Sequence, residues 1–224
     1  MAGWVQHYFN AEQADHDLTA AMGLLPARYT GNDHRRINGS ACKLLLSRIA
    51  IAQGDFTSAK QYTNDLIQGA LYSLVSLNNI FLLDDNQEII WNILPGFAQV
   101  YTPFYKVDNS KTFSPVCRFA EVLLINTEAR ISLNELDATN INQLLTRRSQ
   151  SAVSFTDPSQ ARDALMGTWK NELQREGQRF AKLVKWGTAA QVLGANGYKN
   201  YSGLLPIPQY LLNKNPNIVQ NPGY

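Results

Sequence analysis

The sequence has few of the residues and patterns that mark common chemical sites. It contains only 2 cysteines and 3 histidines among 224 residues. None of them forms a CxxC pair or a Cys/His cluster with the spacing of metal ligands. The signatures GxSxG and HExxH, the phosphate-binding loop and the dinucleotide-binding glycine pattern are also absent. The sequence therefore predicts no metal site and no cofactor.

Charge is scarce and evenly spread. The chain has 20 Lys and Arg, 18 Asp and Glu, and a net charge of +2. Its basic groups are no larger than pairs such as Arg35-Arg36, whereas a nucleic-acid interface usually shows a basic stripe. No run of about eighteen apolar residues could cross a membrane, and no signal peptide follows Met1. We expect no nucleic-acid partner and no transmembrane helix; if the natural protein is exported, this chain is a shortened form of it.

Pairs of carboxylates occur at helical spacing, as in Glu172 and Glu176. Glycosidases need two carboxyl groups that face each other across a cleft. Neighbours on one helix more often form a solvated face or pair with nearby cations, here Arg175 and Arg179. The spacing therefore favours a structural role, and an enzyme is not expected.

Helical periodicity is what the sequence contains. Residues 2–22 show an imperfect apolar stripe, and residues 37–70 show a helical hairpin around Gly54 and Asp55, which are typical capping residues. A second hairpin is predicted over about 118–150. We predict an all-α fold of hairpins like those of tetratricopeptide (TPR) repeats, in a single domain over residues 1–224. A further helix is predicted to begin at Asp157-Pro158.

A long irregular loop is predicted over residues 94–117, and loops of this length are usually functional. Aromatic rings there could stack on the apolar faces of sugars, while amides and carboxylates bind hydroxyl groups. Trp91, in an apolar run, is more typical of a core. For the loop aromatics the sequence leaves ligand binding and packing open. The candidate ligand-binding residues are Tyr101, Phe104, Tyr105, Asn109, Tyr198 and Tyr201.

The last twenty residues combine four prolines with apolar residues. Proline removes a backbone donor and fixes φ, so no long helix or central strand is expected there. We predict that residues 203–224 form an extended tail held to the body by apolar side chains such as Ile207 and Ile218. We also expect Tyr224 to be the native C-terminus.

Four blocks in this order resemble the SusD/RagB family. The first runs from Arg36 to Ala59, similar to R-x-x-x-x-A-x-x-L-L-x-R followed by G-D-(aromatic)-x-x-A. The second begins with RFAEVLL at Arg118, with Thr127 in place of a small residue. The third is ELxxEGxRF from Glu172, followed by Trp186-Gly187. The fourth is the tail, which ends in QNPGY. The resemblance covers about residue 24 to the end, which is the C-terminal portion of such proteins.

The resemblance implies a non-catalytic outer-membrane lipoprotein at the cell surface. Such a protein captures an oligosaccharide or polysaccharide and delivers it to a TonB-dependent transporter. The signal peptide and anchoring cysteine of the family are expected in a region that precedes this chain. An alternative is a TPR-type protein-interaction scaffold that does not bind glycan directly. Family ligand residues form no motif, so the resemblance assigns none.

The sequence departs from the family pattern at several positions. Trp169-Lys170 replaces Glu-Arg, and no Asp follows the Arg179-Phe180 pair. Lys185 replaces an arginine, and Leu211 replaces the acidic residue of the tail pattern.

Overall fold

The computed structural model describes residues 11–30, 34–80, 86–93, 114–174 and 176–224. The described residues divide into two compact units, residues 11–177 and residues 178–224. A single domain over residues 1–224 stays a prediction. Within these ranges no helix is long and apolar enough to cross a membrane.

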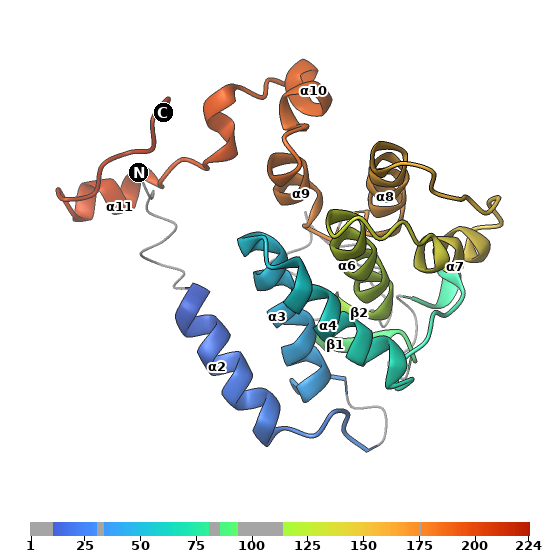
Figure 1. The fold of residues 1–224 in the computed structure, drawn as a ribbon. Helices are drawn as coiled ribbons and strands as arrows, with labels where there is room; N and C mark the ends of the chain where they lie inside the picture. The colour runs from blue at the N-terminus through green and yellow to red at the C-terminus, as the bar shows by residue number, and fades with distance from the viewer. Residues whose placement is uncertain (1–10, 31–33, 81–85, 94–113, 175) are drawn as a thin grey trace. The chain divides into compact units, whose positions relative to one another are not determined.

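The first unit is helical, as predicted (Figure 1). Helices α2, α3, α4 and α6 pack side by side in that order, and α7 and α8 pack on α6. The α3/α4 and α6/α7 pairs are the two predicted hairpins. The first predicted helix is seen as α2, and residues 1–10 lie outside the described ranges. The helices span Ala11–Leu24 (α2), Gly39–Gln53 (α3), Phe56–Gln68 (α4), Phe119–Ser132 (α6), Thr139–Arg147 (α7) and Pro158–Glu172 (α8).

Local capping sets the bounds of the first hairpin. The side chain of Asn38 accepts a hydrogen bond from the backbone N–H of Ala41 at 2.9 Å and so begins α3. Gly54 ends α3 with a φ of 81°, a left-handed conformation that glycine adopts without steric cost. Asp55 then caps α4 by accepting from the N–H of Ser58 at 3.0 Å. Both predicted capping residues are confirmed.

The start of α8 is also set locally. Asp157 accepts hydrogen bonds from the N–H groups of Ser159 and Gln160, each at 2.9 Å. Pro158 occupies the first turn, where its missing N–H costs nothing. The predicted start of this helix is therefore confirmed.

Helix α6 is the centre of the first unit, because twelve of its fourteen residues are buried. Its polar side chains must therefore find partners inside the protein. Asn126 donates to Thr63 at 2.9 Å and accepts from Asn140 at 2.8 Å. These bonds join α6 to α4 and α7, so polar groups as well as apolar packing hold the hairpins together.

Both cysteines are buried free thiols. Cys42 lies in α3, and Cys117 lies in strand β2. Burial raises the pKa of Cys117 to about 12. The two thiols are not joined in a disulfide.

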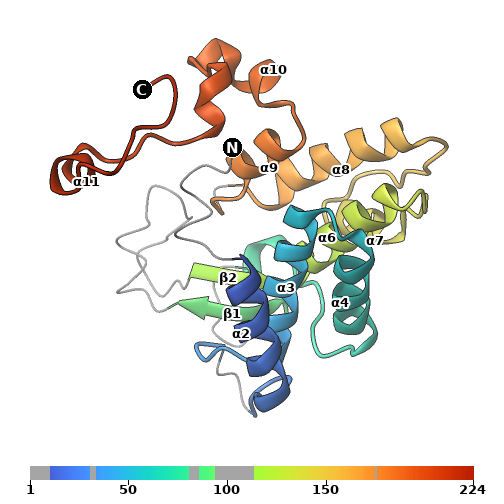
Figure 2. The ribbon, with the colours of Figure 1, turned by 60° about the vertical axis from the view of Figure 1, so that its left-hand side comes forward.

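Two short strands complete the first unit. Strand β1 (Ile89–Ile93) pairs with β2 (Ser114–Arg118) in an antiparallel ribbon, which both views show (Figures 1 and 2). The 3₁₀ turn η1 (Leu77–Asn79) precedes them. Residues 114–117, predicted as the end of the long loop, are therefore strand. Pro115 is compatible with a strand because this ribbon has only two strands, and each is an edge.

The second unit consists of short helices and the tail. Its elements are α9 (Arg179–Lys185), α10 (Ala189–Leu193), η2 (Gly194–Asn196), η3 (Asn200–Gly203) and α11 (Gln209–Lys214). The prediction of a wholly extended tail is wrong at α11. Pro208 immediately precedes this helix, where proline is tolerated, and the next proline is Pro216. The interval between them is long enough for one short helix.

Candidate functional site

The β1/β2 ribbon is the stem of the segment that carries most of the predicted ligand residues. Ile93, the last residue of β1, pairs with Ser114, the first residue of β2. Residues 94–113 therefore leave and re-enter the described structure at one end of the ribbon. This segment carries the predicted Tyr101, Phe104, Tyr105 and Asn109, which lie outside the described residues. Their assignment to ligand binding stays a prediction.

An unpaired polar group lies close to this end of the ribbon. Asn92 is 1% exposed, and among the described residues neither its Nδ2 nor its Oδ1 has a hydrogen-bond partner. Its backbone N–H donates to the carbonyl of His34 at 2.8 Å, so the strand itself is satisfied there. A buried amide that makes no hydrogen bond costs free energy. The Asn92 side chain thus offers one donor group and one acceptor to any polar group that reaches this end of the ribbon. The sequence alone did not identify Asn92 as a candidate.

Trp91 is neither a fully buried core residue nor a fully exposed ring. The ring is half-buried, and Nε1 donates to the carbonyl of Arg35 at 3.3 Å. Irregular pairing on both sides of Trp91 interrupts the register of β1. Such bulges re-aim side chains relative to a regular strand. Part of the Trp91 ring is therefore accessible to solvent, while the hydrogen bond from Nε1 to the backbone of Arg35 holds its polar edge in place.

A buried ion cluster holds the opposite end of the ribbon. Arg118 ends β2 and donates through Nη1 to Glu88 Oε1 at 2.6 Å, just before β1 begins. Its Nε and Nη2 donate to both oxygens of Glu176 at 2.8 and 2.7 Å. Nη1 also donates to Glu172 Oε1 at 3.0 Å. Arg118 therefore ties both strands to the C-terminal end of α8, and we call this set of ion-paired residues the Arg118 cluster.

Two more arginines complete the Arg118 cluster. Arg147 donates to Glu88 and Glu172, and Arg148 Nε donates to Glu172 Oε2 at 3.1 Å. These three carboxylates and three guanidinium groups balance in charge. Arg118, Glu88 and Glu172 have side chains at most 1% exposed. Balanced charges and many hydrogen bonds are what a buried ionic group requires.

Burial and neighbouring charges shift the pKa values in the cluster in different directions. Burial acts to lower the pKa of Arg118, but the carboxylates around it outweigh burial and raise that pKa well above its ordinary value. Burial acts to raise the pKa of Glu172, yet the charges of Arg118 and Arg147 hold it below its ordinary value. For Glu176 burial dominates, and its pKa is raised.

The structure corrects the predicted surroundings of two carboxylates. Glu172 and Glu176 were expected on a solvated face or beside Arg175 and Arg179, but both are buried and bind arginines from other elements. The partner Arg118 lies more than fifty residues away in sequence, which local spacing cannot reveal. Since the two carboxylates share one guanidinium, they do not form the opposed pair across a cleft that glycoside hydrolysis uses.

The other two predicted ligand residues, Tyr198 and Tyr201, belong to the second unit and pack within it. Tyr198 is half-buried, and its ring centroid lies 6.4 Å from that of Phe180. Tyr201 is 41% exposed and meets Tyr224 edge-on at 5.1 Å. Both rings therefore have packing partners. Their role in ligand binding stays a prediction.

The QNPGY end of the tail folds back onto residues 204–207. Gln220 accepts from the N–H of Ile207 at 2.8 Å and donates to its carbonyl at 3.0 Å. Asn221 donates to the carbonyl of Leu205 at 2.7 Å. The hydroxyl of Tyr224 donates to the carbonyl of Leu204 at 2.9 Å. The motif is therefore a set of side chains that fasten one part of the tail to another.

Gly223→Ala is expected to loosen this fold-back. Gly223 has a φ of 99°, and a Cβ added there would lie 2.3 Å from the Tyr201 ring. The left-handed conformation alone costs a non-glycine residue roughly 1–2 kcal/mol. Hydrogen exchange of residues 204–224 should therefore accelerate. Gly194→Ala is the control, because it has a right-handed φ of −56° and nothing within 4 Å of the added Cβ. Equal exchange in the two variants would contradict the expectation.

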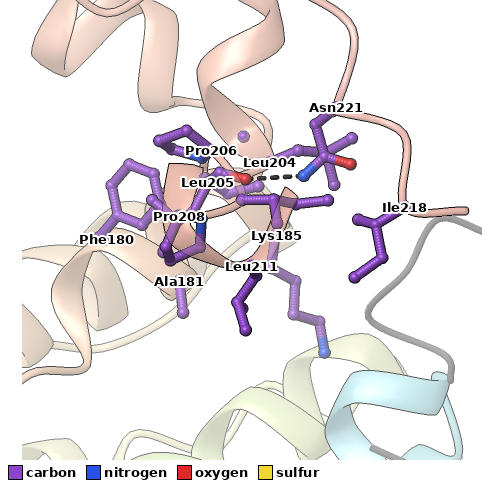
Figure 3. A pocket seen from close by; sticks show the side chains of 13 residues that line it. Phe180, Ala181, Lys185, Leu204, Leu205, Pro206, Pro208, Leu211, Ile218 and Asn221 are labelled. Atoms are coloured by element: carbon purple, nitrogen blue, oxygen red, sulfur yellow. Dashed lines mark hydrogen bonds between the residues drawn. The ribbon is translucent and has the colours of Figure 1, made fainter. Parts of the chain in front are cut away.

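A groove of about 710 Å³ lies in the second unit, between α9 and the folded-back tail (Figure 3). Its walls are almost wholly apolar. The amide of Asn221, one of the few polar groups at its edge, already binds Leu205. Sugar hydroxyls need several polar partners, so this groove does not fit a glycan. The lining includes Phe180, Ala181, Val184, Lys185, Leu204, Leu205, Pro206, Pro208, Leu211 and Ile218.

Comparisons with known proteins agree with the fold. Residues 97–203 match the profile of the SusD family. A SusD superfamily protein from Bacteroides vulgatus ATCC 8482 superposes with a TM-score of 0.81 at 20% identity, over 95% of this chain and 68% of that one. A laminarin-binding SusD-like protein gives 0.74 at 18% identity, over 96% and 68%. Surface glycan-binding protein A from Bacteroides thetaiotaomicron gives 0.75 at 16% identity, over 96% and 70%. No curated protein matches the chain.

The fold is thus that of the all-helical SusD-like class with TPR-like hairpins. The family profile covers 97–203, just under half of the chain, and this match agrees with the resemblance of the sequence blocks to the SusD/RagB family.

The structure explains why the helical blocks of the family pattern carry charged residues. Arg118 from the RFAEVLL block binds Glu172 and Glu176 from the ELxxEG block. Arg48 from the first block donates to both oxygens of Glu121 at 2.6 Å, and Glu121 is buried. The charged residues of these blocks therefore form ion pairs between elements that are distant in sequence, and their role is structural.

Proposed function

We propose that this chain is part of a non-catalytic nutrient-binding protein of the cell surface, which captures an oligosaccharide or polysaccharide and passes it to a TonB-dependent outer-membrane transporter. The match of residues 97–203 to the SusD family profile is the observation that supports this most directly. Two similar solved proteins are named for binding laminarin and surface glycan. The TPR-like scaffold supplies a rigid base from which loops present ligand-binding side chains.

We place the glycan site on the segment that the β1/β2 ribbon carries. The ribbon holds the two ends of residues 94–113 together, and the Arg118 cluster fixes its other end to α7 and α8. Tyr101 and Tyr105 would supply stacking surfaces. Asn92 would supply hydrogen bonds at the base of the segment, because its buried amide has no partner within the part of the chain that the structure describes.

Glycan binding can be tested with the tyrosines of this segment. A glycan array first identifies an oligosaccharide that binds the chain, and isothermal titration then measures its affinity. Tyr101→Ala and Tyr105→Ala should each weaken binding about tenfold, because an aromatic contact is worth about 0.5–1.5 kcal/mol beyond buried area. Tyr210→Ala is the matched control, since Tyr210 is 62% exposed and lies in the other unit.

Two outcomes would count against this proposal. If glycan binding is unchanged in both tyrosine variants, the glycan site does not lie on residues 94–113. Failure to bind any oligosaccharide, together with capture of a transporter barrel, would favour the alternative of a protein-interaction scaffold, for which the α3/α4 and α6/α7 hairpins are suited.

A further inference from the structure

The second unit is unusual in its charge. Residues 178–224 contain five basic residues and no Asp or Glu. Removing these five from the chain's 20 Lys and Arg leaves 15 in residues 1–177, against all 18 Asp and Glu. The near-neutral chain is therefore divided into an acidic part and a short basic part. The basic residues are Arg179, Lys182, Lys185, Lys199 and Lys214.

The apolar groove lies within this basic part. Lys185 lines the groove, and Arg179 and Lys182 belong to the same short helix, α9. Lys214 ends α11, whose Leu211 lines the groove as well. Lysine and arginine can place their stems along an apolar surface while their charges face water. The groove is therefore an apolar hollow on elements that carry only positive side-chain charge.

The groove walls expose large apolar side chains. Leu205 is 68% exposed, Leu204 41% and Phe180 37%. Apolar surface of this kind is typical of an interaction site. Few polar atoms remain for a ligand, because Asn221 already binds Leu205.

We propose that this groove docks an acidic segment of a partner protein, with large apolar side chains of that segment filling the hollow and its carboxylates facing the basic residues. Complementary charge would favour such a segment and disfavour a basic one. The volume of about 710 Å³ lies in the range of hollows that enclose a ligand. A hollow surface suits inserted side chains better than it suits a flat lipid surface. The proposal is independent of glycan binding.

The probe for this surface is a short fluorescein-labelled peptide of glutamate, leucine and phenylalanine, titrated with the intact chain by fluorescence anisotropy. Two further peptides serve as controls. One keeps the glutamates but replaces the apolar residues with serine, and the other replaces glutamate with lysine. Saturable binding of the first peptide alone is expected, and it should weaken as salt rises because the charges are screened.

Three variants locate the binding surface. Leu211→Glu places a carboxylate in the groove wall and restores the residue type of the family pattern, so the fold should tolerate it. It should weaken binding of the acidic apolar peptide by more than about tenfold. Lys185→Glu, on an exposed residue, should weaken binding in the same direction. Val219→Glu adds the same charge at a residue that is 71% exposed and does not line the groove, and it should have a smaller effect.

Several results would overturn the proposal. Equal binding of the serine peptide would show attraction by charge alone. Equal losses of peptide affinity in Leu211→Glu and Val219→Glu would show that the groove is not the binding surface. Binding to phosphatidylglycerol vesicles but not to the peptide would indicate a membrane surface. A dimer in analytical ultracentrifugation that Leu211→Glu disrupts, without peptide binding, would indicate a second copy of the chain. Oligosaccharide affinity should be the same in all three variants, so failure of the glycan proposal is separately visible.

Discussion

Arg118→Met should lower the free energy of unfolding by about 3–5 kcal/mol, because removing one partner from a buried ionic group leaves the others uncompensated. Methionine fills part of the volume but donates none of the five hydrogen bonds that a guanidinium offers. Glu88, Glu172 and Glu176 would then share the site with only two arginines. Urea unfolding followed by circular dichroism measures the loss.

Lys43→Met is the matched control for this measurement. Lys43 binds Asp65 at 2.7 Å, but the two side chains are 30% and 45% exposed. Solvent screens such a pair, which contributes about 0–1 kcal/mol. A similar loss of unfolding free energy in both variants would show that the buried Arg118 cluster contributes no more to stability than an exposed ion pair.

Glu172→Gln should cost about 3 kcal/mol, because this carboxylate faces three guanidinium groups that would lose one of their counter-charges. Glutamine keeps the shape and one acceptor oxygen but removes the charge. Glu176→Gln should cost less. Among the described residues Glu176 binds Arg118 alone, and burial already disfavours its ionised form.

The two substitutions should also change the pH dependence of stability in opposite directions. The pKa of Glu172 is lowered on folding, so its contribution is present above the unfolded value of about 4.3 and is lost as the pH falls through the folded value. The pKa of Glu176 is raised on folding. Its contribution is present below about pH 4.3 and is lost as the pH rises through the folded value.

Urea unfolding in a series of buffers between about pH 3 and pH 7 tests these signs. The difference in stability between the wild type and Glu172→Gln should shrink towards low pH. The wild type should gain stability relative to Glu176→Gln over the same range. Parallel pH profiles for all three proteins would contradict the assigned protonation of the cluster.

Features that depend on neighbouring residues in the sequence could be predicted. Gly54 and Asp55 fix the turn between α3 and α4, and Asp157 fixes the start of α8, because a cap contacts backbone within about one turn. The tail was less predictable. Its prolines suggested extended backbone, but the spacing between Pro208 and Pro216 leaves room for α11.

Features that depend on distant residues could not be predicted. Glu172 and Glu176 looked like exposed neighbours on a helix, since nothing near them in sequence points to Arg118. Asn92 gave no signal, because the burial of its side chain depends on tertiary packing that its sequence neighbours do not reveal. The aromatic residues of the predicted loop were selected from side-chain chemistry, which identifies candidates without placing them.

Gln220 shows how a proline-rich segment can be paired without a sheet. Ile207 lies between Pro206 and Pro208, which have no N–H to donate, so an ordinary ladder of backbone bonds cannot form along this stretch. The Gln220 side chain has the same donor and acceptor groups as a peptide unit, and it binds both the N–H and the carbonyl of Ile207. At Ile207 one glutamine side chain thus makes the two hydrogen bonds that a residue of a neighbouring strand would otherwise make.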